Sequence, residues 1–198
     1  MKRLLCFAIS SVIILSSFKL NHSFAVKDYL SVPSVILNKS TYSLSWSSHP
    51  TETYYKHEYL TAGQKSDTYT NMVMIEAVVG EISLADVVKG KMAELDQRKA
   101  TDPVTNYQIV QNKAKGEYLL DFVLSQSAAG KTSIAEWNAY RYVPLTDKNG
   151  KKGILLFSYS KRGYGDGVTD FLKTLKTARV ADINTIANYT IPAITIKN

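Results

Sequence analysis

The stretch that decides the fold is residues 116–162, which read GEYLLDFVLSQSAAGKTSIAEWNAYRYVPLTDKNGKKGILLFSYSKR. Three runs in it are rich in aromatic, branched and other apolar residues, as strands are, at residues 117–124, 134–143 and 154–159. The segments between them each carry a glycine, and the second contains an Asn-Gly pair that favours a tight reversal. The stretch therefore predicts three consecutive antiparallel strands, with the middle strand organising the sheet.

The second hairpin also predicts which side chains share a face of that sheet. Closing Val143 against Gly153 gives the pairs Tyr142 with Ile154, Tyr140 with Leu156, Asn138 with Ser158 and Glu136 with Ser160. Side chains alternate between faces along a strand. The apolar face, expected to lie under a helix, then carries Trp137, Ala139, Val143, Leu155, Phe157 and Tyr159. The opposite face is polar at one end and carries Glu136, Asn138, Tyr140, Tyr142, Ser158 and Ser160.

Five residues of the polar face form the candidate binding site, called here the Glu136 patch. Its members are Glu136, Asn138, Tyr140, Ser158 and Ser160. An unpaired carboxylate in a low dielectric is costly, so a buried Glu136 needs hydrogen-bond donors, which the neighbouring hydroxyl and amide groups offer. On the other face, Trp137, Phe157 and Tyr159 are expected to pack with helix residues chosen from Leu84, Val88 and Phe171.

The N-terminus is typical of a secretory signal peptide. Lys2 and Arg3 precede a short apolar core, and a small-x-small site follows at residues 23–25, which predicts cleavage after Ala25. The apolar core is shorter than the ~20 residues of a spanning helix, so a membrane anchor is the less favoured alternative. We expect a periplasmic or secreted protein with no transmembrane segment after cleavage.

Composition limits the chemistry of the mature chain, residues 26–198. The only cysteine, Cys6, falls in the predicted signal peptide, which excludes disulfides, a thiol nucleophile and a cysteine-type zinc site. The mature length suits a single domain. Removing Lys2, Arg3 and Lys19 leaves 21 basic against 17 acidic residues, a mild excess without the clustered basic patch of a nucleic-acid binder.

The rest of the sequence predicts further strands, two helices, an N-terminal arm and a C-terminal tail. Apolar or alternating runs predict strands at residues 42–46, 54–60, 71–79 and 107–110. Ser83 begins a helix with a Ser-x-x-acid start and an apolar stripe, and Pro103 stops it. Asp166 is expected to cap a second helix, which continues toward Ile186. Residues 26–40 are expected to form a loose arm, and the apolar tail, residues 190–196, an extra edge segment.

This order of strands, helix, strands and helix predicts the α+β class. We expect a mainly antiparallel sheet with a middle helix and a C-terminal helix packed on it. The order resembles the PsbP-like α/β/α sandwich through IEAVV (75–79), the helix from Ser83, EYLLDFVL (117–124), AEWNAYRY (135–142), GILLFSYS (153–160) and TDFLKTLK (169–176). Members of that fold serve as extrinsic photosystem subunits, small-GTPase binding factors and bacterial accessory proteins. The resemblance therefore implies a binding scaffold rather than a reaction.

Established catalytic and metal motifs are absent from the sequence. The spacing of His49, Glu52, His57 and Glu58 fits no metal site, so we expect two exposed strand-end histidines and neither a metal nor a cofactor. The glycine-rich residues 163–167 precede a helix but lack the spacing of a phosphate loop, and a capped turn is the better interpretation. No Ser/His/Asp set can be nominated.

Two functions from different classes remain open. The first is an exported, non-enzymatic binding or accessory module for an unknown envelope protein, glycan or small molecule. The alternative is a small envelope-polymer hydrolase with Glu136 as acid or base. Glycosidase-like chemistry needs paired carboxylates, and Asp121 on the neighbouring strand is the possible partner of Glu136. The commoner arrangement is that each carboxylate pairs with a hydroxyl or a basic residue.

Overall fold

The computed structural model describes residues 26–128 and 130–197, so the predicted signal peptide lies outside the described residues. One antiparallel sheet of eight strands has the order β1-β2-β3-β4-β8-β7-β6-β5. The strands are β1 (Ser34–Leu37), β2 (Ser40–Thr51), β3 (Tyr54–Leu60), β4 (Asn71–Val79), β5 (Asn106–Asn112), β6 (Glu117–Ala128), β7 (Lys131–Thr146) and β8 (Lys152–Tyr164). The helices are α1 (Leu84–Arg98), a short 3-10 turn (Gly165–Gly167) and α2 (Val168–Asn188).

The three strands predicted from residues 116–162 are β6, β7 and β8. They pair in sequence as two antiparallel hairpins, and β8 also pairs with β4, which joins the two halves of the sheet. The observed bounds of β3 and β4 are the predicted ones. An antiparallel sheet with two helices confirms the α+β class, with strands contributing more residues than helices.

The predicted register of the second hairpin is wrong by two residues. Tyr140 pairs with Ser158, and Asn138 with Ser160, because β7 continues through Pro144 to Thr146. The turn that follows is held by Asp147, whose Oδ1 accepts the backbone N–H groups of residues 149 and 151 at 2.9 and 2.8 Å. A shift of two residues preserves the alternation of side chains, so the predicted division into two faces is correct.

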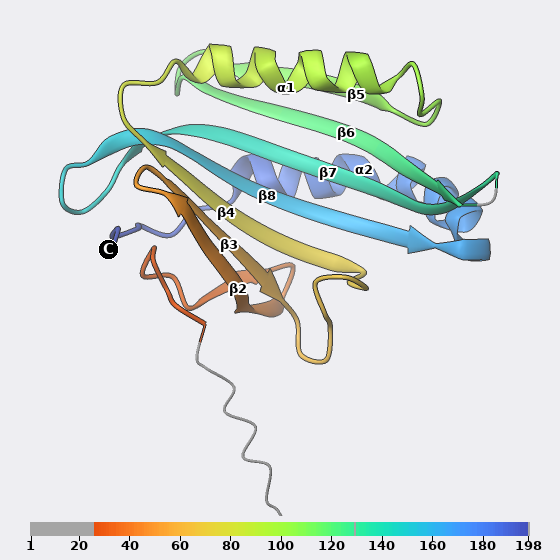
Figure 1. Cartoon of the computed structure of the whole chain (residues 1–198), viewed down its shortest axis with the longest axis horizontal. Coiled ribbons are helices and arrows are strands. Elements are labelled where there is room, and N and C mark those ends of the chain that lie inside the picture. Colours follow the sequence, from red (N-terminus) through yellow and green to blue (C-terminus); the bar gives the residue numbers. More distant parts are fainter. Residues whose placement is uncertain (1–25, 129, 198) are drawn as a thin grey trace, which may run out of the picture.

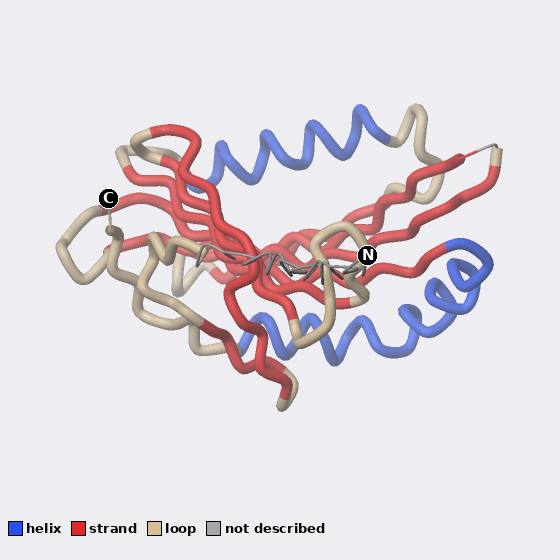
Figure 2. Tube along the Cα trace, turned by 60° about the horizontal axis from the view of Figure 1, so that its bottom comes forward, coloured by secondary structure: helices blue, strands red, loops and turns tan. Residues whose placement is uncertain are grey.

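The two helices cover opposite faces of the sheet (Figures 1 and 2). Ser83 caps α1 as predicted, since its Oγ accepts the Asp86 N–H at 3.3 Å. Val88 and Leu95 of α1 then pack on the face that carries Phe122. Phe171 of α2 packs on the face that carries Trp137, as expected, but Leu84 and Val88 lie on the other face. The sequence pattern does not distinguish which face each helix covers.

Two further local predictions are wrong. Gly167 occupies the N-cap of α2 without a side-chain hydrogen bond, so Asp166 is not a cap. The expected loose arm at residues 26–40 contains β1, and Leu30, Val32, Val35 and Leu37 in or before this strand are buried. β1 pairs with β2, and the segment before β1 contacts the C-terminal tail, where the Thr195 N–H donates to the Leu30 carbonyl at 3.0 Å.

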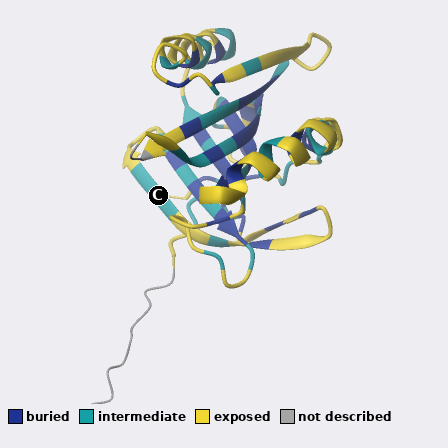
Figure 3. Cartoon of the chain, turned by 90° about the vertical axis from the view of Figure 1, so that its right-hand side faces the viewer, coloured by how far each residue is buried: buried dark blue, intermediate teal, exposed yellow. Residues whose placement is uncertain are grey.

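Burial is concentrated along the sheet between the helices (Figure 3). One buried cluster lies on the α2 face and includes Trp137, Phe157 and Tyr159, together with Ile194 and Ile196 from the tail. A smaller cluster lies on the α1 face around Leu120. No helix within residues 26–128 and 130–197 is long and apolar enough to cross a membrane.

Candidate functional site

The structure brings the Glu136 patch together on the α1 face. Glu136, Asn138 and Tyr140 follow one another along β7, and Ser158 and Ser160 pair with the last two across to β8. Asn138, Ser158 and Ser160 are buried. The patch therefore exists as a cluster, although most of it lies beneath the surface.

The carboxylate of Glu136 accepts three hydrogen bonds. Its Oε2 accepts the Tyr69 hydroxyl at 3.0 Å and the Arg162 Nε–H, and its Oε1 accepts the Asn138 amide at 2.9 Å. The Ser160 hydroxyl donates in turn to the Asn138 carbonyl at 2.5 Å. The Arg162 guanidinium also lies over the Tyr69 ring at 4.1 Å. The network satisfies the charge internally, which is the arrangement of a structural ion pair.

Two tyrosines of this region are strongly perturbed. Burial, reinforced by the neighbouring Glu136 carboxylate, raises the pKa of the Tyr69 hydroxyl well above its ordinary value. Burial likewise raises the pKa of Tyr140. Both hydroxyls therefore stay protonated at neutral pH and act as neutral groups. The cavity beside the network is small, about 120 Å³, and is lined in part by Arg98 and Arg162.

The carboxylate pair of the hydrolase hypothesis does not form. Asp121 pairs with Ala139 across to β7, whereas Glu136 pairs with Leu124. This places the Asp121 side chain on the α2 face and Glu136 on the α1 face. The two carboxylates are separated by the sheet and cannot flank one bond of a substrate.

The expectation of two exposed histidines is wrong. His57 is fully buried, and its ring accepts the Tyr29 N–H at 3.1 Å and contacts the Tyr59 hydroxyl at 3.0 Å. Burial lowers its pKa against the opposing effect of Asp28, so the ring is neutral at pH 7. Among the described residues, no group of three or more His, Cys, Asp or Glu side chains can hold a metal ion.

A second candidate site, which the sequence did not predict, lies on the α2 face. A cavity of about 270 Å³ opens between α2 and the strands β5 and β6, and is called here the Trp137 cavity. It is somewhat smaller than typical drug-sized pockets. Its apolar walls include Val104, Val123, Trp137, Leu172 and Leu175.

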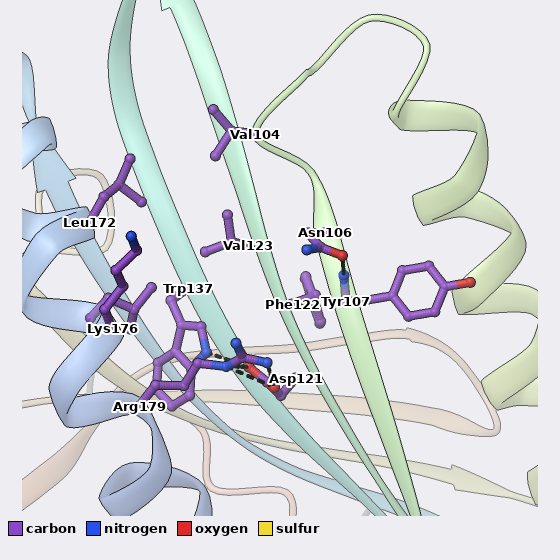
Figure 4. A pocket seen from close by; sticks show the side chains of 11 residues that line it. Val104, Asn106, Tyr107, Asp121, Phe122, Val123, Trp137, Leu172, Lys176 and Arg179 are labelled. Atoms are coloured by element: carbon purple, nitrogen blue, oxygen red, sulfur yellow. Dashed lines mark hydrogen bonds and ion pairs between the residues drawn. The ribbon is translucent and has the colours of Figure 1, made fainter.

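A buried ion pair closes one end of the Trp137 cavity. Asp121 is 2% exposed, and its Oδ1 accepts the indole N–H of Trp137 at 2.6 Å. Arg179 reaches from α2 to the same carboxylate through Nε at 2.8 Å and through Nη2 (Figure 4). The pair fixes the indole ring and ties α2 to β6. It thereby holds the floor and one wall of the cavity in place.

The remaining polar residues at the cavity are Asn106, Lys176 and Tyr107, and the Tyr107 side chain points away from the cavity (Figure 4). Tyr107 donates its hydroxyl to Asp96 at 3.0 Å, so its polar end is used outside the cavity. Asn106 and Lys176 lie on opposite sides of the apolar floor (Figure 4). Helix α2 brings both Lys176 and Arg179 to the cavity. Asp121 within the apolar run EYLLDFVL was the one signal that a buried charge needed a partner.

A further cavity of about 250 Å³ lies along the same helix, near Val110, Leu119 and Ile183. Its cation, Arg141, bonds to Glu117 at 3.0 Å and to the Tyr189 carbonyl at 2.7 Å. Arg141 therefore serves the C-terminal end of α2 rather than a ligand.

A protein-family model matches residues 30–191, which is most of the chain, and the chain belongs to that family. The matched range runs from the segment before β1 to the segment after α2 and contains both candidate sites. Searches of curated proteins and of solved structures gave no match.

Proposed function

We propose that this protein is an exported, non-enzymatic binding module that holds a small, mainly apolar ligand in the Trp137 cavity. The observation that carries the proposal is the cavity itself: apolar walls, a fixed aromatic floor and a few polar groups at the ends. Ligand sites commonly have this composition. The predicted signal peptide, residues 1–25, and the resemblance to the PsbP-like binding scaffold support the same function.

The state of the carboxylates argues for binding rather than hydrolysis. A general acid or base must exchange a proton with the substrate through a free oxygen. The Glu136 carboxylate accepts three hydrogen bonds, and the Asp121 carboxylate accepts hydrogen bonds from Trp137 and Arg179. The hydrolase hypothesis keeps a simple test, because Glu136→Gln must abolish any turnover of envelope polymer by the pure protein. An unchanged rate in that variant excludes Glu136 as acid or base.

The binding proposal is tested with a neutral, environment-sensitive aromatic probe, phenylnaphthylamine. The chain has two tryptophans, and Trp46 is 43% exposed, so Trp46→Phe leaves the buried Trp137 as the reporter. We expect saturable probe binding that changes Trp137 fluorescence. Val123→Phe fills the cavity and is expected to weaken binding about tenfold, roughly 1.4 kcal/mol.

The matched control is Val180→Phe, at a residue of α2 that is 63% exposed and outside the cavity. It adds the same side chain and is expected to leave probe binding unchanged. Absence of saturable binding to the Trp46→Phe protein contradicts the proposal. So does equal binding by the two phenylalanine variants, because the probe then sits elsewhere.

A further inference from the structure

The acceptors at the Trp137 cavity are already used. Both oxygens of Asp121 receive hydrogen bonds from Trp137 and Arg179. The side-chain carbonyl of Asn106 accepts the Tyr107 N–H at 2.8 Å. A ligand that enters the cavity therefore finds no free carboxylate and no free side-chain amide oxygen to which it could donate.

The groups that remain are donors. Because Asn106 Oδ1 faces the Tyr107 N–H, its Nδ2 points away from that bond and toward the cavity (Figure 4). Arg179 uses Nε and Nη2 for Asp121, which leaves Nη1. Within residues 26–128 and 130–197, the Lys176 ammonium has no hydrogen bond or ion pair. An exposed Lys and a guanidinium nitrogen thus adjoin an apolar cavity.

The net charge at the cavity rim is positive, like the charges of Lys176 and Arg179. Lys176 and Arg179 contribute two positive charges and Asp121 one negative charge, so the cavity rim carries a net charge of +1. Charges next to low-dielectric walls act more strongly than in open water. A cation would be repelled by this rim, and a neutral hydroxyl-rich ligand would find no free carboxylate or side-chain amide oxygen for its own donors.

We infer that the ligand of the Trp137 cavity is a small amphipathic anion. Its apolar body lies against Trp137, Val123 and Leu172, and its carboxylate, sulfonate or phosphate group meets Lys176, with the free Arg179 nitrogen beside it. This inference rests on the proposed function and names the ligand class for the same site. The apolar walls supply the binding energy and the cations select the charge.

The test compares two probes that share one aromatic body. Anilinonaphthalene sulfonate carries a sulfonate, and phenylnaphthylamine does not. We expect the anionic probe to bind the full-length Trp46→Phe protein at least tenfold more tightly at low salt, with the difference shrinking as salt screens the rim. Lys176→Gln should lower the affinity for the anionic probe severalfold and leave the neutral probe unchanged.

Lys173→Gln is the matched control, because Lys173 lies on the same helix, is exposed and pairs with Asp170 at 3.4 Å away from the cavity. It should change the affinity for neither probe. Equal affinities for the two probes overturn the anion inference while the binding module stands. Failure of both probes to bind removes the proposed function and the inference together. Preferential anion binding that survives both Lys176→Gln and Val123→Phe also overturns the inference, because the anion is then bound at another place.

Discussion

The buried Asp121 carboxylate and the Arg179 guanidinium differ in their access to water. Asp121 has 3% of its side chain exposed and Arg179 has 32%. Removing the cation leaves a carboxylate in a dry environment, whereas removing the carboxylate leaves a cation that water can reach. We therefore predict that Arg179→Met costs about 3 kcal/mol of unfolding free energy and Asp121→Asn only about 1–2 kcal/mol, both measured by urea unfolding.

The exposed pair between Asp170 and Lys173 provides the control. Their side chains are 84% and 72% exposed, so Asp170→Asn should change the free energy of unfolding by less than about 0.5 kcal/mol. A smaller loss in Arg179→Met than in Asp121→Asn contradicts the argument. In that case the carboxylate is not held mainly by the guanidinium.

Asp102 predicts a pH dependence of stability. Burial raises its pKa, but hydrogen bonds from the Ser125 hydroxyl at 2.7 Å and N–H at 2.6 Å, with Arg98 at 3.1 Å, outweigh burial and lower the pKa to about 2. The folded pKa thus lies below the ordinary value of 3.8. The stabilisation is therefore complete above about pH 4 and is lost as the pH falls toward 2.

The measurement compares the wild type with Asp102→Asn. The difference in unfolding free energy between them should shrink by about 2 kcal/mol between pH 6 and pH 2, since one pKa unit corresponds to about 1.4 kcal/mol. The comparison cancels the other carboxylates, which titrate in both proteins. A difference that stays constant over this range shows that the Asp102 carboxylate gains nothing from its ionised form.

At the residue scale, the sequence predicted which face of the sheet each side chain is on, but not its partners from distant segments. The pleat alone placed Glu136 and Asn138 on one face and Trp137 on the other. The Asn138 amide was a predicted donor to Glu136, but Tyr69 and Arg162 were missed, because Tyr69 comes from the β3–β4 loop and Arg162 lies beyond the predicted end of the third strand. Contacts between distant segments leave no periodic trace in the sequence.

The approach of α2 to the sheet depends on one glycine. An added Cβ on Gly163 of β8 would lie 2.5 Å from the Cβ of Phe171, so the helix would have to move. We predict that Gly163→Ala destabilises the protein by about 1–3 kcal/mol, as overpacked cores do. Thermal or urea unfolding measures the loss, and probe binding at the Trp137 cavity reports whether α2 has shifted.

Gly167 is the matched control for this substitution. It precedes α2 with a φ of −74°, and an added Cβ there meets nothing within 4 Å. Gly167→Ala should therefore be neutral or stabilise by up to about 1 kcal/mol through the unfolded state. Equal losses in the two variants would show that the close contact with Phe171 is not what makes Gly163 sensitive.

At the element scale, the sequence predicted those elements whose own pattern is complete. The apolar run of β4 and the Ser83 start of α1 carry their signals locally. β1 carries none, because Val35 and Leu37 are buried in a cluster that includes Ile194 and Ile196 from a tail more than 150 residues away. The Trp137 cavity was missed for the same reason, since its walls come from four separate elements.

At the scale of the whole molecule, the pairing of β4 with β8 joins both halves into one sheet. Residues 71–79 pair with residues 153–161, so neither half is complete without the other. α2 then covers the second half from the side that carries the Trp137 cavity. The binding site is therefore a product of the complete fold and is expected to disappear as a unit when the sheet opens.

The last prediction concerns export of the whole molecule. Just after the predicted cleavage site, the Lys27 carbonyl accepts the Ser47 hydroxyl at 2.7 Å. Cleavage after Ala25 would thus release a chain whose second residue already contacts the folded domain. We predict that the protein from the cell envelope begins at Val26, as determined by intact mass and N-terminal sequencing. Because the cleavage site requires small side chains, Ala25→Arg should accumulate the uncleaved precursor, whereas Ala25→Ser should be processed normally. Uncleaved wild-type protein in the cytoplasm would contradict export, which is one part of the proposed function.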